Sequence, residues 1–273
     1  MGEAVSKNFN KYVEYSAHAP WKLKVEPFRL APSIYYVGNE WVGAFLVDAK
    51  EDGLILIDTC VFENVYLTIE MIRELGYDPK KIRHIMLTHC HVDHAGGAKA
   101  LQELSGAKIW LSEQDDQFKD EPANYEMDST FYVPPYKVDE YYDDNRVLHF
   151  GDVTIQTVLT PGHTPGTTSF FITSPDEEGK MLVSAVHGGV GPLTMQKDYL
   201  EKYDLPRDLP QQFIDGCRRL KEYHVDIAIP SHPAHGNLFQ RRSEDPQNYK
   251  VLIDEKMWPE FLDSRIEFVE KML

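Results

Sequence analysis

The stretch THCHVDHAGG, residues 88–97, places three histidines and an aspartate within six positions and follows them with two glycines. It completes the run KIRHIMLTH, which reads as a strand, and side chains two residues apart in a strand point the same way. We therefore expect His89 and His91 to face one point. Asp93 and His94 lie beyond the bend, where a helix begins, and face a neighbouring point. The pattern predicts two adjacent metal ions at a strand-to-helix turn.

The chemistry of this stretch narrows the choice of metal. Imidazole nitrogen and carboxylate oxygen, with no thiolate, suit zinc first and then iron or manganese. Gly96 and Gly97 let the backbone turn tightly beside the metals. The alternative is a helix start with capping groups and surface histidines. A cap needs one acceptor and not three imidazoles, so the metal interpretation is favoured.

Two later histidines stand where predicted strands end in turns. His163 lies within PGHTPG and His232 within SHPAHG. Either histidine alone would be typical of a turn, but their shared position at strand ends places both on one rim. We expect the first metal to be held by His89, His91 and His163, and the second by Asp93, His94 and His232, with His235 in reserve.

The remaining pattern predicts two similar halves, each with strands followed by helical periodicity, and no low-complexity linker between them. We expect a single domain over residues 1–273, in which two sheets with helices outside bury both sets of strands. The predicted strands are 34–38, 41–48, 53–59, 81–89, 107–112, 153–160, 169–173, 181–186 and 226–230, and the predicted helices are 62–75, 98–104, 211–223 and 246–272.

Composition restricts the classes of partner. Lys and Arg number 28 against 44 Asp and Glu, and the net charge of −16 disfavours nucleic acid and suits a small-molecule substrate. No run approaches the roughly 20 apolar residues that span a bilayer, so we expect no membrane partner. The three cysteines are widely spaced and lack a CxxC pair, which favours reduced thiols. The first 24 residues lack the features of a secretory signal, which predicts a cytoplasmic protein. The oligomeric state is left open.

Four motifs together resemble the metallo-β-lactamase superfamily: HxHxDH, the aspartate Asp58 in LILIDTC, GHTPG, and SHP. From about Trp21 onward the chain is most similar to the third subclass of these β-lactamases, including FYVPPYKVDEYY and HFGDVTI. The resemblance implies an α/β fold, an αββα sandwich of two mixed β-sheets with helices on both outer faces. It also implies a two-zinc site. The resemblance further implies that Asp58 would support the metal loops without binding metal, and that His232 would complete the second zinc site.

The sequence departs from part of the superfamily at one place. Glyoxalase II and the quorum-quenching lactonases bridge their metals with an aspartate after the strand that here reads MLVSAVHGGVG, and this run has no carboxylate. His187 stands near that position, either as a ligand or substrate contact or as a loop histidine. His235 and Tyr132 are the other candidate substrate contacts. Tyr132 belongs to an aromatic-rich stretch, residues 112–146, which either covers the site or fills the core.

These features predict a metal-dependent hydrolase of a lactone, ester, amide or thioester. A hydroxide held between two zinc ions is a nucleophile at neutral pH, and Asp93 would orient it as well as bind metal. A true β-lactamase is the main alternative, and a mononuclear iron persulfide dioxygenase is another. The charge disfavours the RNA-processing relatives, and His91 in place of a carboxylate disfavours the diiron relatives. A protein that only binds metal is a further alternative.

Overall fold

The computed structural model describes residues 11–126 and 130–273. The first ten residues, on which the expected lack of a secretory signal partly rests, lie outside this description, as do residues 127–129 of the aromatic-rich stretch. Within the described residues, no helix combines the length and apolar character needed to cross a membrane.

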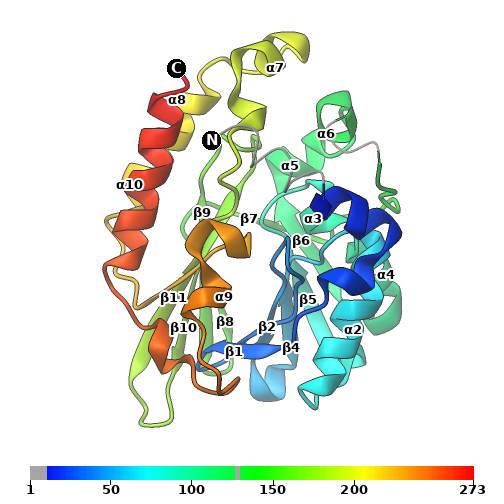
Figure 1. Ribbon diagram of the computed structural model, residues 1–273, viewed down its shortest axis with the longest axis vertical. Helices are drawn as coiled ribbons and strands as arrows, with labels where there is room; N and C mark the ends of the chain where they lie inside the picture. Colours follow the sequence, from blue (N-terminus) through cyan, green and yellow to red (C-terminus); the bar gives the residue numbers. More distant parts are fainter. Residues whose placement is uncertain (1–10, 127–129) are drawn as a thin grey trace.

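Two mixed β-sheets pack face to face, as Figure 1 shows. The first sheet has the order β1-β2-β3-β4-β5-β6-β7, antiparallel up to β4 and parallel from β4 to β7. The second has the order β12-β11-β10-β9-β8 and is antiparallel except for the pair β11 and β12. The strands are β1 (Phe28–Ala31), β2 (Ile34–Tyr36), β3 (Phe45–Asp48), β4 (Leu54–Ile57), β5 (Ile82–Met86), β6 (Lys108–Ser112), β7 (Glu140–Tyr142), β8 (Arg146–Phe150), β9 (Val153–Leu159), β10 (Thr168–Pro175), β11 (Met181–Val186) and β12 (Ile227–Ile229).

Helices cover the outer face of each sheet, so the expected αββα sandwich is confirmed. The first sheet is covered by α2 (Val65–Glu74) and α4 (Ala98–Ser105), and the second by α8 (Leu209–Leu220) and α10 (Met257–Glu270). The shorter helices are α3 (Val92–Ala95), α5 (Glu113–Phe118), α6 (Pro122–Glu126), α7 (Lys197–Lys202) and α9 (Leu238–Arg241). The 3-10 helices are η1 (Pro20–Leu23), η2 (Lys50–Asp52), η3 (Phe62–Asn64), η4 (Pro79–Lys81), η5 (Leu193–Met195), η6 (Pro233–Gly236) and η7 (Tyr249–Leu252).

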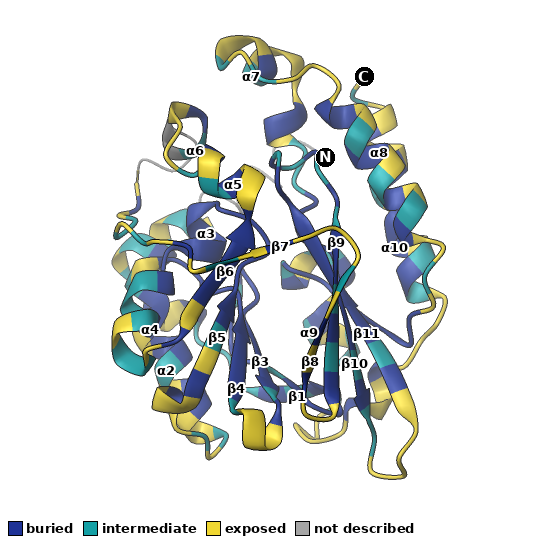
Figure 2. Cartoon of the chain, turned by 180° about the vertical axis from the view of Figure 1, so that it is seen from behind, coloured by how far each residue is buried: buried dark blue, intermediate teal, exposed yellow. Residues whose placement is uncertain are grey.

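Three layers of apolar side chains hold the sandwich together. Between the sheets, Phe45 of β3 and Phe170 of β10 belong to one fully buried cluster. Outside them, Met71 of α2 packs on the first sheet and Trp258 of α10 on the second. Figure 2 shows that the central parts of the strands are mostly buried, whereas the helices have exposed outer surfaces. Burial of each such side chain stabilises the fold by about 1.5–3 kcal/mol.

The C-terminal helix is shorter than the sequence pattern indicated. The expectation of a helix over 246–272 is wrong for its first part, because residues Tyr249–Leu252 form the 3-10 helix η7. Tyr249 and Leu252 are buried in the cluster between the sheets, whereas α10 packs against the outer face of the second sheet. One straight helix could not reach both layers.

The aromatic-rich stretch, residues 112–146, divides between core and surface. Phe118, Phe131 and Tyr142 are buried, whereas Tyr132 and Tyr141 are 60% and 42% exposed. Part of this stretch therefore fills the core, and part of it stands at the surface.

Candidate metal centre

Four connections after strands bring the predicted site residues together. Asp58 follows β4, the run 89–94 follows β5, His163 lies between β9 and β10, and His232 follows β12. β4 and β5 are parallel neighbours, so their carboxyl ends meet at one edge of the first sheet. The loops from the second sheet complete the arrangement at the same end of the sandwich (Figure 1).

The first cluster consists of His89, His91 and His163. One ring nitrogen from each lies within 4.8 Å of the others, and His91 Nδ1 is 3.0 Å from His163 Nε2. Tetrahedral donors about 2.0–2.1 Å from a zinc ion lie roughly 3.3 Å from one another, so this spacing suits one metal. His89 Nε2 is buried and has no hydrogen-bond partner among the described residues. A metal would satisfy that nitrogen.

The second cluster consists of Asp93, His94 and His232. His232 Nε2 lies 3.3 Å from both Asp93 Oδ2 and His94 Nε2, and Asp93 Oδ2 lies 3.6 Å from His94 Nε2. These separations also match the edges of a tetrahedron around zinc. His89, Asp93 and His94 have ligand atoms within 4.8 Å of one another, so the two clusters adjoin.

Asp58 supports both clusters through hydrogen bonds to His94 and to Thr88, which contacts His89. Its Oδ2 accepts a hydrogen bond from His94 Nδ1 at 2.7 Å, which leaves His94 Nε2 unprotonated and facing the second cluster. Asp58 also accepts hydrogen bonds from the backbone N–H and the hydroxyl of Thr88, both at 2.8 Å. The Thr88 hydroxyl is in turn 3.0 Å from His89 Nδ1. Asp58 itself has a φ of 57°, a left-handed conformation that these contacts maintain.

Backbone carbonyls orient two further histidines. His163 Nδ1 donates to Gly191 O at 2.7 Å, and His232 Nδ1 donates to Trp41 O at 2.9 Å. A carbonyl oxygen can only accept, so each contact fixes the proton on Nδ1 and leaves Nε2 as a lone-pair donor. Both Nε2 atoms are the ones that face the clusters.

The electrostatics of the site favour neutral imidazole in the first cluster. Burial, reinforced by the neighbouring histidines, lowers the pKa of His89 well below its ordinary value. Burial likewise lowers the pKa of His163 to about 4. Burial also acts to lower the pKa of His94, but the carboxylates of Asp93 and Asp58 outweigh it and raise that pKa. Neutral imidazoles are the ligands that a divalent metal requires, and the first cluster provides them directly. At the second cluster, a metal would displace the proton that the raised pKa of His94 favours. The nitrogen and oxygen donors of both clusters fit a divalent metal.

His187 points away from these clusters. Its ring packs near Phe213 and Trp258 in the apolar layer beneath α8 and α10. Its Nε2 lies 3.6 Å from Cys217 Sγ, and its Nδ1 accepts a hydrogen bond from the Gly189 N–H at 3.2 Å. The structure therefore places His187 as a buried residue of the fold, with both ring nitrogens in contacts outside the clusters.

The other two candidate substrate contacts differ in position. The His235 ring is 5.2 Å from the His232 ring, and its Nδ1 is buried without a hydrogen-bond partner among the described residues. Tyr132 is exposed and packs edge-on against Phe62, with ring centroids 5.9 Å apart. His235 thus adjoins the second cluster, whereas Tyr132 stands at the surface.

Sequence reasoning missed Asp115, a buried carboxylate that contacts two of the loops that carry predicted metal ligands. Burial raises the pKa of Asp115 to about 6, and hydrogen bonds from Thr164, Gly166 and Cys90 act in the opposite direction. The only available signal was the sequence SEQD, residues 112–115, which has the form of a helix-capping box.

A third group, His224, Asp226 and Glu255, has ligand atoms within 4.8 Å of one another. His224 and Glu255 are exposed, and Asp226 already accepts a hydrogen bond from Val183 N at 2.8 Å. This group is less buried than the two histidine clusters, and among the described residues it has no buried ligand atom without a hydrogen-bond partner, such as His89 Nε2 in the first cluster.

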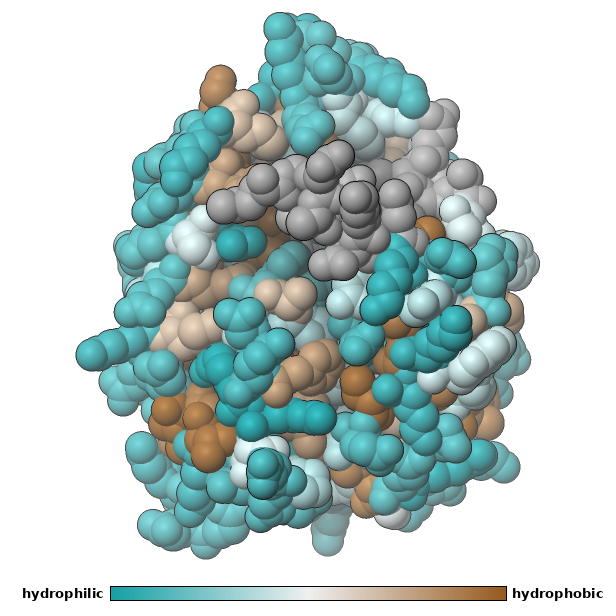
Figure 3. Space-filling model, viewed as in Figure 1, coloured by the Kyte–Doolittle hydropathy of each residue, from teal (hydrophilic) through white to brown (hydrophobic). Residues whose placement is uncertain are grey.

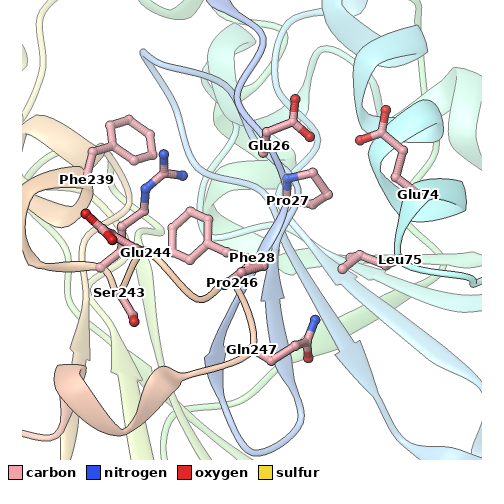
Figure 4. Close-up of a pocket in the computed structure, with 11 residues that line it drawn as sticks. Glu26, Pro27, Phe28, Glu74, Leu75, Phe239, Ser243, Glu244, Pro246 and Gln247 are labelled. Atoms are coloured by element: carbon pink, nitrogen blue, oxygen red, sulfur yellow. The ribbon is translucent and has the colours of Figure 1, made fainter.

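A cavity of about 700 Å³ opens beside β1 and α9 (Figure 4). Phe28 and Phe239 line it, together with the carboxylates Glu26, Glu74 and Glu244. Among the described residues that line it there is no histidine, so this cavity is separate from the candidate metal centre. The face seen in Figure 3 is mostly hydrophilic, with small separate hydrophobic groups.

Comparison with known proteins identifies the class to which this fold and this centre belong. Residues 42–232 match the model of the metallo-beta-lactamase superfamily, and the chain belongs to that superfamily. The chain is 27% identical over 125 residues to N-acyl homoserine lactonase AttM of Agrobacterium fabrum, covering 42% of this chain and 44% of AttM. It is 25% identical over 186 residues to hydroxyacylglutathione hydrolase GloC of Haemophilus influenzae, covering 65% of this chain and 80% of GloC.

The structure is similar to that of the class B3 di-zinc metallo-beta-lactamase LRA-12 from an Alaskan soil metagenome. The TM-score is 0.81 at 22% identity, over 94% of this chain and 97% of LRA-12. The expected superfamily and the expected likeness to its third β-lactamase subclass are therefore confirmed at the level of the fold. The match to AttM spans less than half of that enzyme's length.

Proposed function

We propose that the protein is a zinc-dependent hydrolase that cleaves a cyclic or linear carbonyl bond in a small molecule. The observation that carries the proposal is the pair of adjoining ligand clusters, one of three histidines and one of an aspartate and two histidines. Zinc suits this set of nitrogen and oxygen donors best, and iron or manganese suits it next.

Two bound zinc ions would activate water near neutral pH and polarise the carbonyl group that is attacked. The side chains of the protein would place the two ions and the attacking water. His89, His91 and His163 would hold the first ion, and the Asp93 cluster the second. With Oδ2 of Asp93 directed into the second cluster, its Oδ1 is left to accept a hydrogen bond from the attacking water and to orient it. No separate protein base is required.

The substrate class rests on the relatives and on charge. The matched relatives include a lactonase and a hydroxyacylglutathione hydrolase, which favours a lactone, ester or thioester. The net charge of −16 disfavours a nucleic-acid substrate.

A true β-lactamase is the second candidate, favoured by the similarity of the fold to LRA-12 over most of both chains. The absence of a carboxylate from residues 181–191 points the same way, because the expected bridging aspartate of lactonases has no counterpart in that run. A third candidate, a mononuclear iron persulfide dioxygenase, is distinguished from the zinc-dependent hydrolase and the β-lactamase by its metal.

Metal analysis of the purified protein tests the proposal. We expect two zinc equivalents per chain, and about one in each of the variants His163→Ala and His232→Ala. His149→Ala removes an exposed histidine and should retain two equivalents. A chain that binds no metal would refute the proposal, and a single iron would favour the dioxygenase. A screen with a chromogenic β-lactam, a lactone and a thioester then separates the hydrolase candidates.

A further inference from the structure

Asp115 lies in the first turn of α5, between two loops that bear predicted metal ligands. Ser112 caps this helix by accepting a hydrogen bond from Asp115 N at 3.2 Å. In a capping box the carboxylate at this position returns to the backbone of the capping residue. Here the Asp115 carboxylate is directed away from its own helix and toward the two loops.

Three hydrogen bonds join the carboxylate to those loops. Asp115 Oδ2 accepts from the Cys90 N–H at 2.9 Å and from the Thr164 hydroxyl at 2.8 Å. Asp115 Oδ1 accepts from the Gly166 N–H at 2.7 Å. Asp115 is 0% exposed, so water does not compete for these contacts. One buried carboxylate therefore holds the loop after β5 and the loop between β9 and β10.

The bonded residues are direct neighbours of predicted metal ligands. Cys90 stands between His89 and His91, and Thr164 follows His163. The two loops meet at the first cluster, where His91 Nδ1 and His163 Nε2 are 3.0 Å apart.

The approach of the loop to α5 is tight. A Cβ added at Gly166 would lie 2.0 Å from Ser112 Oγ and 2.8 Å from Asp115 Oδ1. Only glycine therefore lets the backbone of this loop reach the carboxylate.

We propose that Asp115 is a positioning residue that sets the spacing of the three-histidine cluster without binding metal itself. The inference rests on the proposed function, because it assumes that the first cluster holds a metal. The second cluster has separate supports: Asp58 orients His94, and the Trp41 carbonyl orients His232. Loss of the Asp115 carboxylate should therefore weaken the first metal site much more than the second.

The variant Asp115→Asn isolates this role at nearly constant volume. A carboxylate accepts at both oxygens, whereas an amide offers one oxygen and one NH₂ group. If the NH₂ group replaces Oδ1, it opposes the Gly166 N–H. If it replaces Oδ2, it opposes the Cys90 N–H. Either orientation sets a donor against a backbone donor, so one of the two backbone contacts that hold the loops is lost.

Each metal site is measured alone by removing the other. In a His232→Ala background, competition of Zn²⁺ with a chromophoric chelator reports the first site. In a His163→Ala background, the same titration reports the second site. We expect Asp115→Asn to weaken Zn²⁺ binding roughly 10- to 100-fold in the first background and less than about threefold in the second. The d–d absorption bands of Co²⁺ bound at the first site should shift as well.

Two further variants make the result decisive. Thr164→Val removes one hydroxyl and keeps both backbone contacts, so it should fold and weaken the first site by only about threefold to tenfold. Asp116→Asn changes the adjacent residue, whose carboxylate contacts Tyr141 and Lys119 and not the metal loops, and should leave both sites unchanged.

The outcomes separate the two hypotheses. If the protein without substitutions binds no metal, the proposed function fails. If it binds two metals and Asp115→Asn binds Zn²⁺ as tightly at the first site, the positioning role is refuted. Equal weakening of both sites, or a first site unchanged in Thr164→Val as well as in Asp115→Asn, would also overturn it.

Discussion

Replacement of Asp58 by asparagine should impair the second metal site by changing the proton on His94. The Asp58 carboxylate accepts the Nδ1 proton of His94 at 2.7 Å, which leaves Nε2 free to bind metal. In Asp58→Asn, an oxygen in the place of Oδ1 keeps the bond from Thr88 N, and the NH₂ group then faces His94 Nδ1. His94 must accept that bond on Nδ1 and carry its proton on Nε2, where it opposes the metal.

The size of the effect follows from the contact that is lost. A hydrogen bond to a charged acceptor contributes about 1.5–3 kcal/mol. This corresponds to a loss of metal affinity of roughly 10- to 100-fold. The metal-free protein should lose only about 1 kcal/mol in free energy of unfolding, because the bond from Thr88 N survives.

Titration of Zn²⁺ in the His163→Ala background measures this affinity, and urea denaturation of the metal-free protein measures the stability. Asp152→Asn, an exposed aspartate, is the matched control and should change neither quantity. If Asp58→Asn bound zinc at the second site with unchanged affinity, the tautomer argument would be refuted.

Three further predictions concern stability, each checked by urea denaturation. Gly216→Ala should stabilise the protein by roughly 0.5–1 kcal/mol, because the site is helical and the nearest atoms to an added Cβ lie 3.6 Å away; a destabilised variant would contradict this. Gly166→Ala should destabilise it by about 1–3 kcal/mol through the contact with Ser112, and an unchanged midpoint would show that the loop yields freely. A hydrogen bond from its own backbone N–H, with help from Arg29, holds the pKa of Glu177 at about 2. Because that pKa is depressed, Glu177→Gln should cost roughly 1 kcal/mol above pH 4.5, and the difference should vanish as the pH falls toward 2; a pH-independent difference would contradict the assignment.

The sequence contained enough information for the layers of the fold and for the residues that converge. The i, i+2 rule placed His89 and His91 on one side of a strand end, and the positions of His163 and His232 after other strands brought them to the same rim. Strand periodicity also predicted the central strands of both sheets. These features follow from a simple spacing along the chain, so they can be predicted without knowledge of long-range contacts.

The parts that were missed depend on contacts that have no local pattern. β1 and β7 are short, with four and three residues, and are defined by pairing with distant strands. The carbonyls of Trp41 and Gly191 orient two histidines, but any residue supplies a carbonyl, so the sequence cannot mark them. Asp115 looked like an ordinary capping residue because its partners, 25 and 51 residues away in the chain, were not visible.

The donors of the second cluster come from both halves of the chain, with Asp93 and His94 after β5 of the first sheet and His232 after β12 of the second. A bound ion would therefore link the two halves of the chain through a reversible contact. Any opening that separates the two sheets would have to release it, and saturation with metal would oppose that opening by mass action. A chelator should for this reason make the folded chain easier for a protease to cut, even where the cleavage points lie far from the histidines.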